Sequence, residues 1–215
     1  MVLIGIGGAG SNLVEQFSDS HKKIYFRISD FPKKCSTAEE FEKFCPNFSK
    51  ILNFKEEECW VAVCGAGKVA GATLRILQKI KRKKINIMYI TPQEYMMSPI
   101  QKKRHKVVFN VLQEYTRSGL LNKMYLFSNQ KVLDIIGEQP ITSMYKMINK
   151  QVANTIESLE WFKTQEPTIG SIHTEKEISR ICTVSVGNFK KNEEKVLFSL
   201  DNITETCYIY SISNE

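Results

Sequence analysis

The 215-residue sequence has little of what metal sites and disulfide frameworks require. Its three histidines are scattered and show no zinc-ligand spacing, so we do not expect a catalytic metal site. None of its six cysteines forms a C-x-x-C pair, and several lie in apolar, strand-like runs, where cysteine behaves as a small hydrophobic residue. We therefore expect reduced thiols with a structural role.

Long apolar runs are also missing. No stretch approaches the roughly 20 apolar residues that cross a bilayer, and the first ten residues, MVLIGIGGAG, have neither the basic start nor the cleavage site of a secretory signal. We therefore expect a cytoplasmic protein without a membrane span. With 42% hydrophobic residues, the chain can bury one domain and a small appendage.

Acidic residues are in the minority, with 23 Asp and Glu against 30 Lys and Arg and a net charge of +7. The basic excess is concentrated in residues 79–84 and 102–106. Such runs can meet phosphates, but the first ends a predicted helix, where basic residues complement the helix dipole. Neither run is interleaved with aromatic residues, as RNA-binding motifs are. We therefore do not expect a nucleic acid as partner.

What the sequence does contain is an alternation of apolar strands and helices. A helix is predicted after each of two glycine-rich loops, and two more are predicted at 100–118 and at 36–44. In the last of these, Ser36 and Glu39 offer a capping box. This alternation is typical of a parallel sheet covered on both faces, the Rossmann-like α/β plan. The predicted strands are residues 2–6, 24–28, 59–64, 85–90 and 123–127.

Beyond the sheet, apolar residues at helical spacing predict one long amphipathic helix from 142 to 162. The remaining residues, 163–215, contain a helix-like stretch near 174–182 and two alternating, strand-like segments, 195–200 and 206–212.

The two glycine-rich loops are GIGGAGSN, residues 5–12, and GAGKVAG, residues 65–71. Both follow predicted strands directly, and ligands of doubly wound folds bind at the carboxyl ends of strands. Glycines let a phosphate approach the backbone N–H groups at a helix start. The sequence therefore predicts that both loops lie on one edge and share one ligand; for GAGKVAG alone, a tight turn with a solvated lysine is the alternative.

The order of these features resembles the FtsZ and tubulin family over about residues 1–160. GIGGAGSN resembles the family's first nucleotide loop, and GAGKVAG stands where the family carries G-G-G-T-G-[ST]-G. Three later segments resemble the family's Thr-Lys-Pro, Lys-Lys-Arg and Ile-Pro-Asn-Asp-Arg-Leu-Leu: they are Thr91-Pro92, Lys102-Lys103-Arg104 and residues 127–133. Tyr145 and Asn149 match the aromatic residue and the asparagine with which tubulins hold guanine.

The resemblance implies a Rossmann-like tubulin/FtsZ nucleotide-binding domain over residues 1–162, with a parallel sheet and a long central helix, and a reduced α+β segment over 163–215. It also implies a guanine nucleotide, GTP or GDP, with or without Mg²⁺. The residues implied at the phosphates are Gly7, Gly8, Ala9, Ser11, Asn12, Gly65, Ala66, Gly67 and Lys68. Those implied at the nucleoside are Asn129, Tyr145 and Asn149, with Arg104 reaching base or ribose.

The chemistry of these side chains suits those roles. Tyr145 can stack on a purine while Asn149, one helical turn on, offers a donor and an acceptor. Plainer roles stay open: core packing for Tyr145, capping or exposure for Asn149, a turn position for Asn129 and a solvated helix face for Arg104.

Two departures from the family bear on activity. In GAGKVAG, Lys68, Val69 and Ala70 replace a threonine, a glycine and a hydroxyl residue of the family. Valine does not easily take positive φ, and the loss of the glycine and the hydroxyl is the feature that favours a module without nucleotide. Either Lys68 supplies a point charge for a phosphate, or the loop has drifted after losing its ligand. The family's acidic N-x-D-x-x-D loop has no counterpart in residues 168–177, where Glu175 and Glu177 do not fit the spacing. We therefore expect a GTPase at most, and no catalytic residue is assigned.

The function that follows is a weakly hydrolysing or non-hydrolysing nucleotide-binding protein that self-associates, or that caps or modulates the cytoskeletal filament of an FtsZ/tubulin-like partner. Two alternatives remain. One is an interaction module that kept the fold and lost the nucleotide. The other is an NAD(P)-binding Rossmann protein, for which Asp30 stands at the end of the second strand, although no catalytic pair follows.

Overall fold

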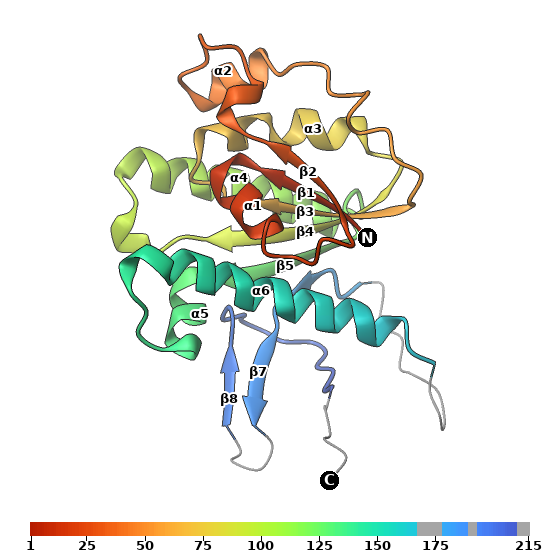
Figure 1. Ribbon diagram of the computed structural model, residues 1–215, viewed down its shortest axis with the longest axis vertical. Helices are drawn as coiled ribbons and strands as arrows, with labels where there is room; N and C mark the ends of the chain where they lie inside the picture. The colour runs from red at the N-terminus through yellow and green to blue at the C-terminus, as the bar shows by residue number, and fades with distance from the viewer. Residues whose placement is uncertain (167–177, 189–192, 210–215) are drawn as a thin grey trace.

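The apolar runs of the sequence form a six-stranded parallel sheet in the computed structural model, which describes residues 1–166, 178–188 and 193–209 (Figure 1). The strand order is β2-β1-β3-β4-β5-β6, and every neighbouring pair runs parallel. The strands are β1 Val2–Ile6, β2 Lys22–Phe26, β3 Glu58–Val63, β4 Lys84–Thr91, β5 Lys123–Ser128 and β6 Ile181–Cys182. The predicted α/β class and its five strands are confirmed, with ends shifted by one or two residues.

Helices cover the sheet on both faces. On one face, Phe41, Ile76 and Leu112 pack with Ile4, Val61 and Ile87 of the sheet. On the other, Leu13, Val132 and Ile156 pack with Leu3, Trp60 and Met88. Because both faces are covered, the central strands are apolar at nearly every position rather than at alternate ones. The helices on the first face are α2 Ala38–Lys43, α3 Thr73–Lys79 and α4 Pro99–Arg117. The helices on the second face are α1 Gly7–Val14, α5 Asn129–Ile136 and α6 Ile141–Lys163.

The helix ends follow local sequence signals. Ser98 and Gln101 form a capping box at the start of α4, with Pro99 in the first turn, and Gly119 lies just beyond its end with φ +81°. The capping box of α2 is one residue later than predicted, because the Thr37 hydroxyl accepts from the Glu40 N–H.

The predicted second strand ends too late. The chain leaves β2 at Phe26 and forms the 3-10 turn η1, Ile28–Asp30. The Asp30 carboxylate accepts from the Arg27 N–H at 2.6 Å and so closes this turn. A side chain to backbone bond of this kind competes with the sheet ladder, and Ile28 is left exposed.

The predictions for the carboxy-terminal segment are partly wrong. Residues 174–177 of the helix predicted near 174–182 lie outside the described residues. The rest of that prediction is wrong, because residues 178–180 are not helical and Ile181 and Cys182 form β6 beside Met124 and Tyr125. The strand predicted at 195–200 begins earlier, as β8 Glu193–Val196, and pairs antiparallel with β7 Ser185–Asn188, which was not predicted. Residues 206–209 are not a strand, and the division of the chain into domains at residue 162 stays a prediction.

All six cysteines are free. Burial raises the pKa of the Cys59 thiol to about 12, which agrees with the structural role expected for these thiols. Among the described helices, none is both long and apolar enough to cross a membrane.

Candidate nucleotide site

The first glycine loop joins β1 to α1, and most of its glycines serve close packing. A Cβ on Gly10 would overlap the carbonyl oxygen of Ala62 in β3, and one on Gly5 would lie 2.6 Å from the Cα of Ser11. Gly7 has φ +73°, a conformation that side chains rarely adopt. These three glycines therefore let α1 begin directly at the end of β1 and lie against β3.

The second glycine loop continues β3 into the 3-10 turn η2, Lys68–Ala72, and then into α3. A Cβ on Gly71 would overlap the carbonyl oxygen of Ala38, and one on Gly65 would overlap the Tyr89 hydroxyl, so both glycines seat neighbouring elements. Val69 needs no positive φ, because it lies in the helical turn with its side chain in the core. The departure at Val69 is thus a packing feature of this turn.

Two glycines have no such packing reason. A Cβ on Gly8 would meet nothing within 4 Å, and one on Gly67 would meet only the Cys64 carbonyl at 3.8 Å. Both residues are exposed, and neither has positive φ. Chain packing does not require glycine at these positions, whereas a ligand that approaches the backbone does.

The topology brings these two loops together. β1 and β3 are neighbours, and the ideal Cβ position of Gly7 lies 3.6 Å from the Cβ of Val69. The chain leaves β1 toward the α1 face and leaves β3 toward the α3 face, and these are opposite faces of the sheet. Such a topological switch point is where open α/β sheets bind ligands. The prediction that both loops lie on one edge is confirmed.

The polar residues of the first loop differ in how they face this edge. Gly8, Ala9 and Asn12 are exposed. Ser11 is fully buried, and its hydroxyl donates to the carbonyl of Gly5 at 3.4 Å, so it holds the loop together from within.

The residues of the second loop also differ in exposure. Lys68 is exposed, whereas Gly65 is turned toward Tyr89 and Ala66 is buried. Arg104 is half-buried in α4 and donates to the carbonyl of Ala66 at 2.9 Å. The structure therefore joins Arg104 to the second loop from the α2–α4 face; it is not the solvated residue of the plainer alternative.

The nucleoside candidates lie at the carboxyl ends of β4 and β5. Asn129 follows β5 as the first residue of α5, with an exposed fraction of 8%, so it is not a turn residue. Asn149 is half-buried on α6, whose amino-terminal half lies at the same edge (Figure 1). Tyr145 is 45% exposed, which excludes the core-packing alternative. Its hydroxyl donates to the Oε1 of Gln93 at 3.3 Å.

Several polar groups at this edge have no partner. Thr91 Oγ1 and Gln93 Nε2 are buried without a hydrogen bond, and among the described residues the side chains of Asn129 and Asn149 have none either. Register places Thr91 opposite Ser128, so Asn129 follows directly beside the β4 end. Buried polar groups are normally paired, and a cluster of unpaired ones is what a polar ligand would satisfy. The sequence did not single out Gln93, since nothing marks a glutamine after a strand as buried.

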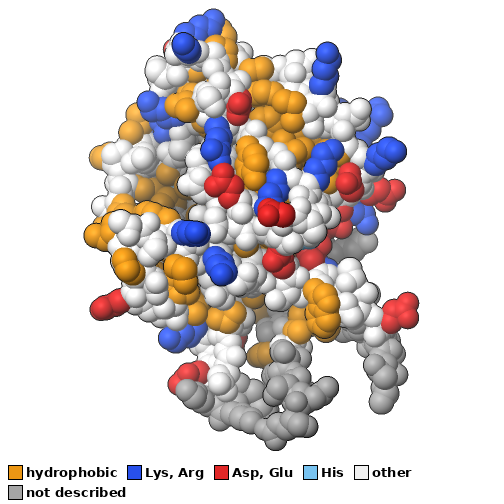
Figure 2. Space-filling view, in the orientation of Figure 1, with side chains coloured by type: hydrophobic (Ala, Val, Ile, Leu, Met, Phe, Trp, Pro, Cys, Tyr) orange, Lys and Arg blue, Asp and Glu red, His pale blue; other side chains and the backbone are white. Residues whose placement is uncertain are grey.

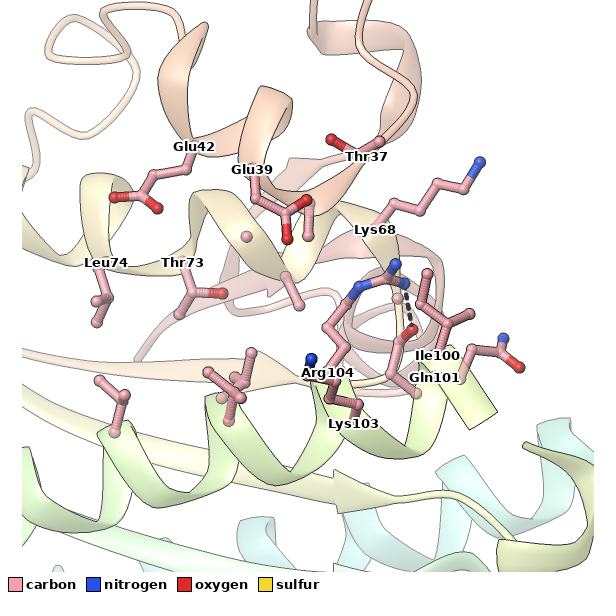
Figure 3. Close-up of a pocket in the computed structure, with 18 of the residues that line it drawn as sticks. Thr37, Glu39, Glu42, Lys68, Thr73, Leu74, Ile100, Gln101, Lys103 and Arg104 are labelled. Atoms are coloured by element: carbon pink, nitrogen blue, oxygen red, sulfur yellow. Dashed lines mark hydrogen bonds between the residues drawn. The ribbon is translucent and has the colours of Figure 1, made fainter. Parts of the chain in front are cut away.

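A separate cavity of about 940 Å³ opens between α2, the second loop and α4 (Figure 3). It shares Ala66, Gly67, Lys68 and Arg104 with the predicted site but lies on the opposite face of the sheet from α6. No sequence pattern marks this cavity, because its shape depends on where α2 packs against Gly71. The acidic-loop comparison, with Glu175 and Glu177, falls outside the described residues.

The parallel sheet, its helices on both faces and its paired glycine loops define a doubly wound α/β protein with a topological switch point at β1 and β3. Within that class the protein has an FtsZ/tubulin-like fold. It is similar to CetZ2 from Haloferax volcanii in a GTPγS-bound protofilament, with a TM-score of 0.58 and 12% identity over 74% of this chain and 57% of that chain.

Two FtsZ structures from M. jannaschii are also similar. The empty dimer has a TM-score of 0.57 and 14% identity over 79% of this chain and 56% of that chain. A point mutant has a TM-score of 0.58 and 14% identity over 79% of this chain and 58% of that chain. The chain thus spans little more than half the length of these proteins. No protein-family model matches the sequence, and no curated protein matches it. At such identities the likeness shows the fold alone.

Proposed function

We propose that the protein binds a guanine nucleotide, GTP or GDP, with or without Mg²⁺, at the edge formed by the two glycine loops. The nucleotide is a structural or switching ligand that is hydrolysed slowly or not at all. The protein acts in the cytoplasm by self-association, or by capping or modulating the filament of a related protein.

The observation that carries this proposal is the row of unpartnered polar groups beside two glycines that packing does not require. Gly8 and Gly67 leave bare backbone on two adjacent loops at the switch point. Thr91, Gln93 and Asn129 place polar atoms without partners beside them, at the ends of the next strands. A ligand with a charged end and a polar, flat end satisfies both features.

Each part of the site has a distinct task. The N–H groups at the start of α1 and along the second loop would meet phosphate oxygens, helped by the positive end of the helix dipole. Lys68, exposed at the head of η2, would add a point charge. Asn149 and Asn129 would offer donors and acceptors to the base or ribose. The half-exposed ring of Tyr145 would offer a surface on which the base can stack.

The similar structures support the ligand and the mode of action. The CetZ2 structure is described as a GTPγS-bound protofilament, and one FtsZ structure as a dimer. The ligand edge of this chain is also rimmed by exposed hydrophobic side chains, which gather at the left of Figure 2 over the starts of α4 and α6. Such a patch is typical of a surface that meets another protein. The exposed hydrophobic residues at or just before the starts of these two helices include Tyr95, Met96, Ile100, Ile141 and Tyr145.

The dinucleotide alternative is less well supported. Asp30, which would have to hold a ribose, instead closes the η1 turn by accepting from the Arg27 N–H. The alternative of a nucleotide-free module rested on Val69 and Ala70, and both side chains are accounted for by core packing.

The test is thermal unfolding of nucleotide-free protein with GTP, GDP, ATP and NAD, each with and without Mg²⁺. A ligand at one hundred times its dissociation constant stabilises the folded state by about 2.7 kcal/mol. We expect GTP and GDP to raise the unfolding temperature by more than ATP and NAD. An equal response to GTP and ATP would contradict the guanine assignment, and no response at millimolar ligand would favour the nucleotide-free module.

A further inference from the structure

The cavity between α2, the second glycine loop and α4 is a second ligand site, and we propose that it binds a small amphipathic carboxylate with an aliphatic body. This cavity shares Gly67 and Lys68 with the proposed nucleotide edge, but it lies on the α4 face of the sheet. It touches the reverse side of the same loop, and its own test does not depend on any nucleotide.

The side chains that line the cavity indicate which apolar group a ligand would carry. Its apolar residues are aliphatic, and no aromatic side chain lines the described cavity. A purine would have no ring to stack on here. The α4 residues of the lining run from Ile100 to Leu112, a distance of roughly 18 Å at the rise of an α-helix. An elongated, aliphatic chain fits this shape. The aliphatic side chains of the lining are Leu74, Ile100, Val107, Val108, Val111 and Leu112.

One hydroxyl in the cavity is unsatisfied. Thr73 has an exposed fraction of 1% and lines the cavity, and its Oγ1 has no hydrogen-bond partner in the part of the chain that the structure describes. Figure 3 shows this hydroxyl on the side of Thr73 that faces Arg104 and away from Leu74. A buried hydroxyl without a partner is unfavourable. An oxygen of a ligand held between Thr73 and Arg104 would satisfy it.

The charges at the cavity favour an anion. Lys68, Lys103 and Arg104 line the end beside the second loop, and within the described chain neither lysine has an ion pair. Two carboxylates also line the cavity. Glu42 pairs with Arg75 at 3.7 Å. Hydrogen bonds from the Glu39 N–H and from Thr37, together with the charge of Arg104, lower the pKa of Glu39, so Lys68 and Lys103 are the cations left for an anionic ligand. The cationic end and the aliphatic end together select an acyl chain with a carboxylate head.

The first experiment is calorimetric titration of the full chain with decanoate, decanol and decylammonium. We expect one decanoate site, weaker binding of decanol, and no binding of decylammonium at this site. Val111→Trp, which fills the aliphatic end, should abolish decanoate binding. Failure of all three probes to bind the folded protein would overturn the proposal, and would direct attention to a protein segment as occupant.

Three conservative variants separate binding from folding. Thr73→Val should raise the unfolding temperature of the empty protein, because it removes an unsatisfied hydroxyl, and should weaken decanoate binding roughly fivefold, the worth of one hydrogen bond. Lys103→Gln should weaken decanoate but not decanol. Lys102→Gln is the control, since Lys102 pairs with Glu94 outside the lining. Decanoate affinity that is unchanged in both Thr73→Val and Lys103→Gln would contradict the site.

Discussion

The two glycine loops of this protein are alike in sequence but are shaped by different neighbours. In the first, Gly10 lets α1 lie against β3; in the second, Gly71 lets α2 lie against η2. Each loop also holds one glycine, Gly8 or Gly67, that no neighbour requires. The comparison shows that most glycines of a phosphate-type motif here serve packing, and it leaves Gly8 and Gly67 as the positions at which a ligand role can be tested.

The largest effect is expected on stability, and it should differ between two glycines of the same helix, α1. Gly10→Ala should lower the free energy of unfolding by about 3 kcal/mol, since its Cβ would overlap the Ala62 carbonyl. Gly8→Ala, two residues away, should be neutral or raise it by about 0.5–1 kcal/mol, because alanine is the better helix former. Urea unfolding of both variants measures this. Equal destabilisation would show that Gly8 also serves packing.

The next prediction concerns binding. Gly8→Asp places a carboxylate in the first turn of α1, which is favourable for the helix but repels a phosphate. The variant should fold and should lose the stabilisation of about 2.7 kcal/mol that saturating GTP gives the wild type. Asn47→Asp adds the same charge in the connection between α2 and β3 and should keep the response. A full GTP response in Gly8→Asp would exclude Gly8 from the phosphate site.

A smaller effect is expected at the base. Asn149→Leu should reduce the preference for GTP over ATP by roughly fivefold, about 1 kcal/mol, through loss of a hydrogen bond. Asn154→Leu is the matched control, because Asn154 is exposed farther along α6. Competition titration of the two nucleotides measures the ratio. If both variants keep the wild-type preference, Asn149 does not read the base.

The smallest expected effect is a pH dependence on the α4 face. The Tyr89 hydroxyl lies 3.0 Å from His105 Nδ1, and burial lowers the pKa of His105, opposed by the Glu94 carboxylate. As pH falls below 6.5, the unfolded state therefore takes up the proton before the folded state does, and stability falls. Wild type should lose more stability than His105→Gln between pH 7 and 5.5. Identical losses in wild type and His105→Gln would contradict this account.

The sequence predicted the sheet well, because its central strands are nearly continuous apolar runs bounded by glycine loops. It predicted α4 and α6 to within a residue, since a capping serine, a terminal glycine and long periodic patterns mark them. It missed α5, whose eight residues follow β5 without a break and start from Ser128 as cap. It missed β6, because a two-residue strand exists only through pairing with β5.

The site was predictable only in part. The shared edge of the two loops followed from their position directly after strands of a parallel sheet, but the burial of Ser11 and Val69 did not. Burial of a side chain in a loop depends on which helix lies against it. The cavity beside α2 was hidden for the same reason, as its walls come from three segments that meet only in the folded chain.

The most direct measurement is to denature the purified protein, identify any released small molecule by chromatography, and titrate the refolded, emptied chain with GTP, GDP, ATP and NAD. The account predicts a released guanine nucleotide or guanine-selective binding that Gly8→Asp abolishes. Absence of both in a correctly refolded protein would contradict it, and would leave the glycine loops as turns of an FtsZ/tubulin-like fold without a nucleotide.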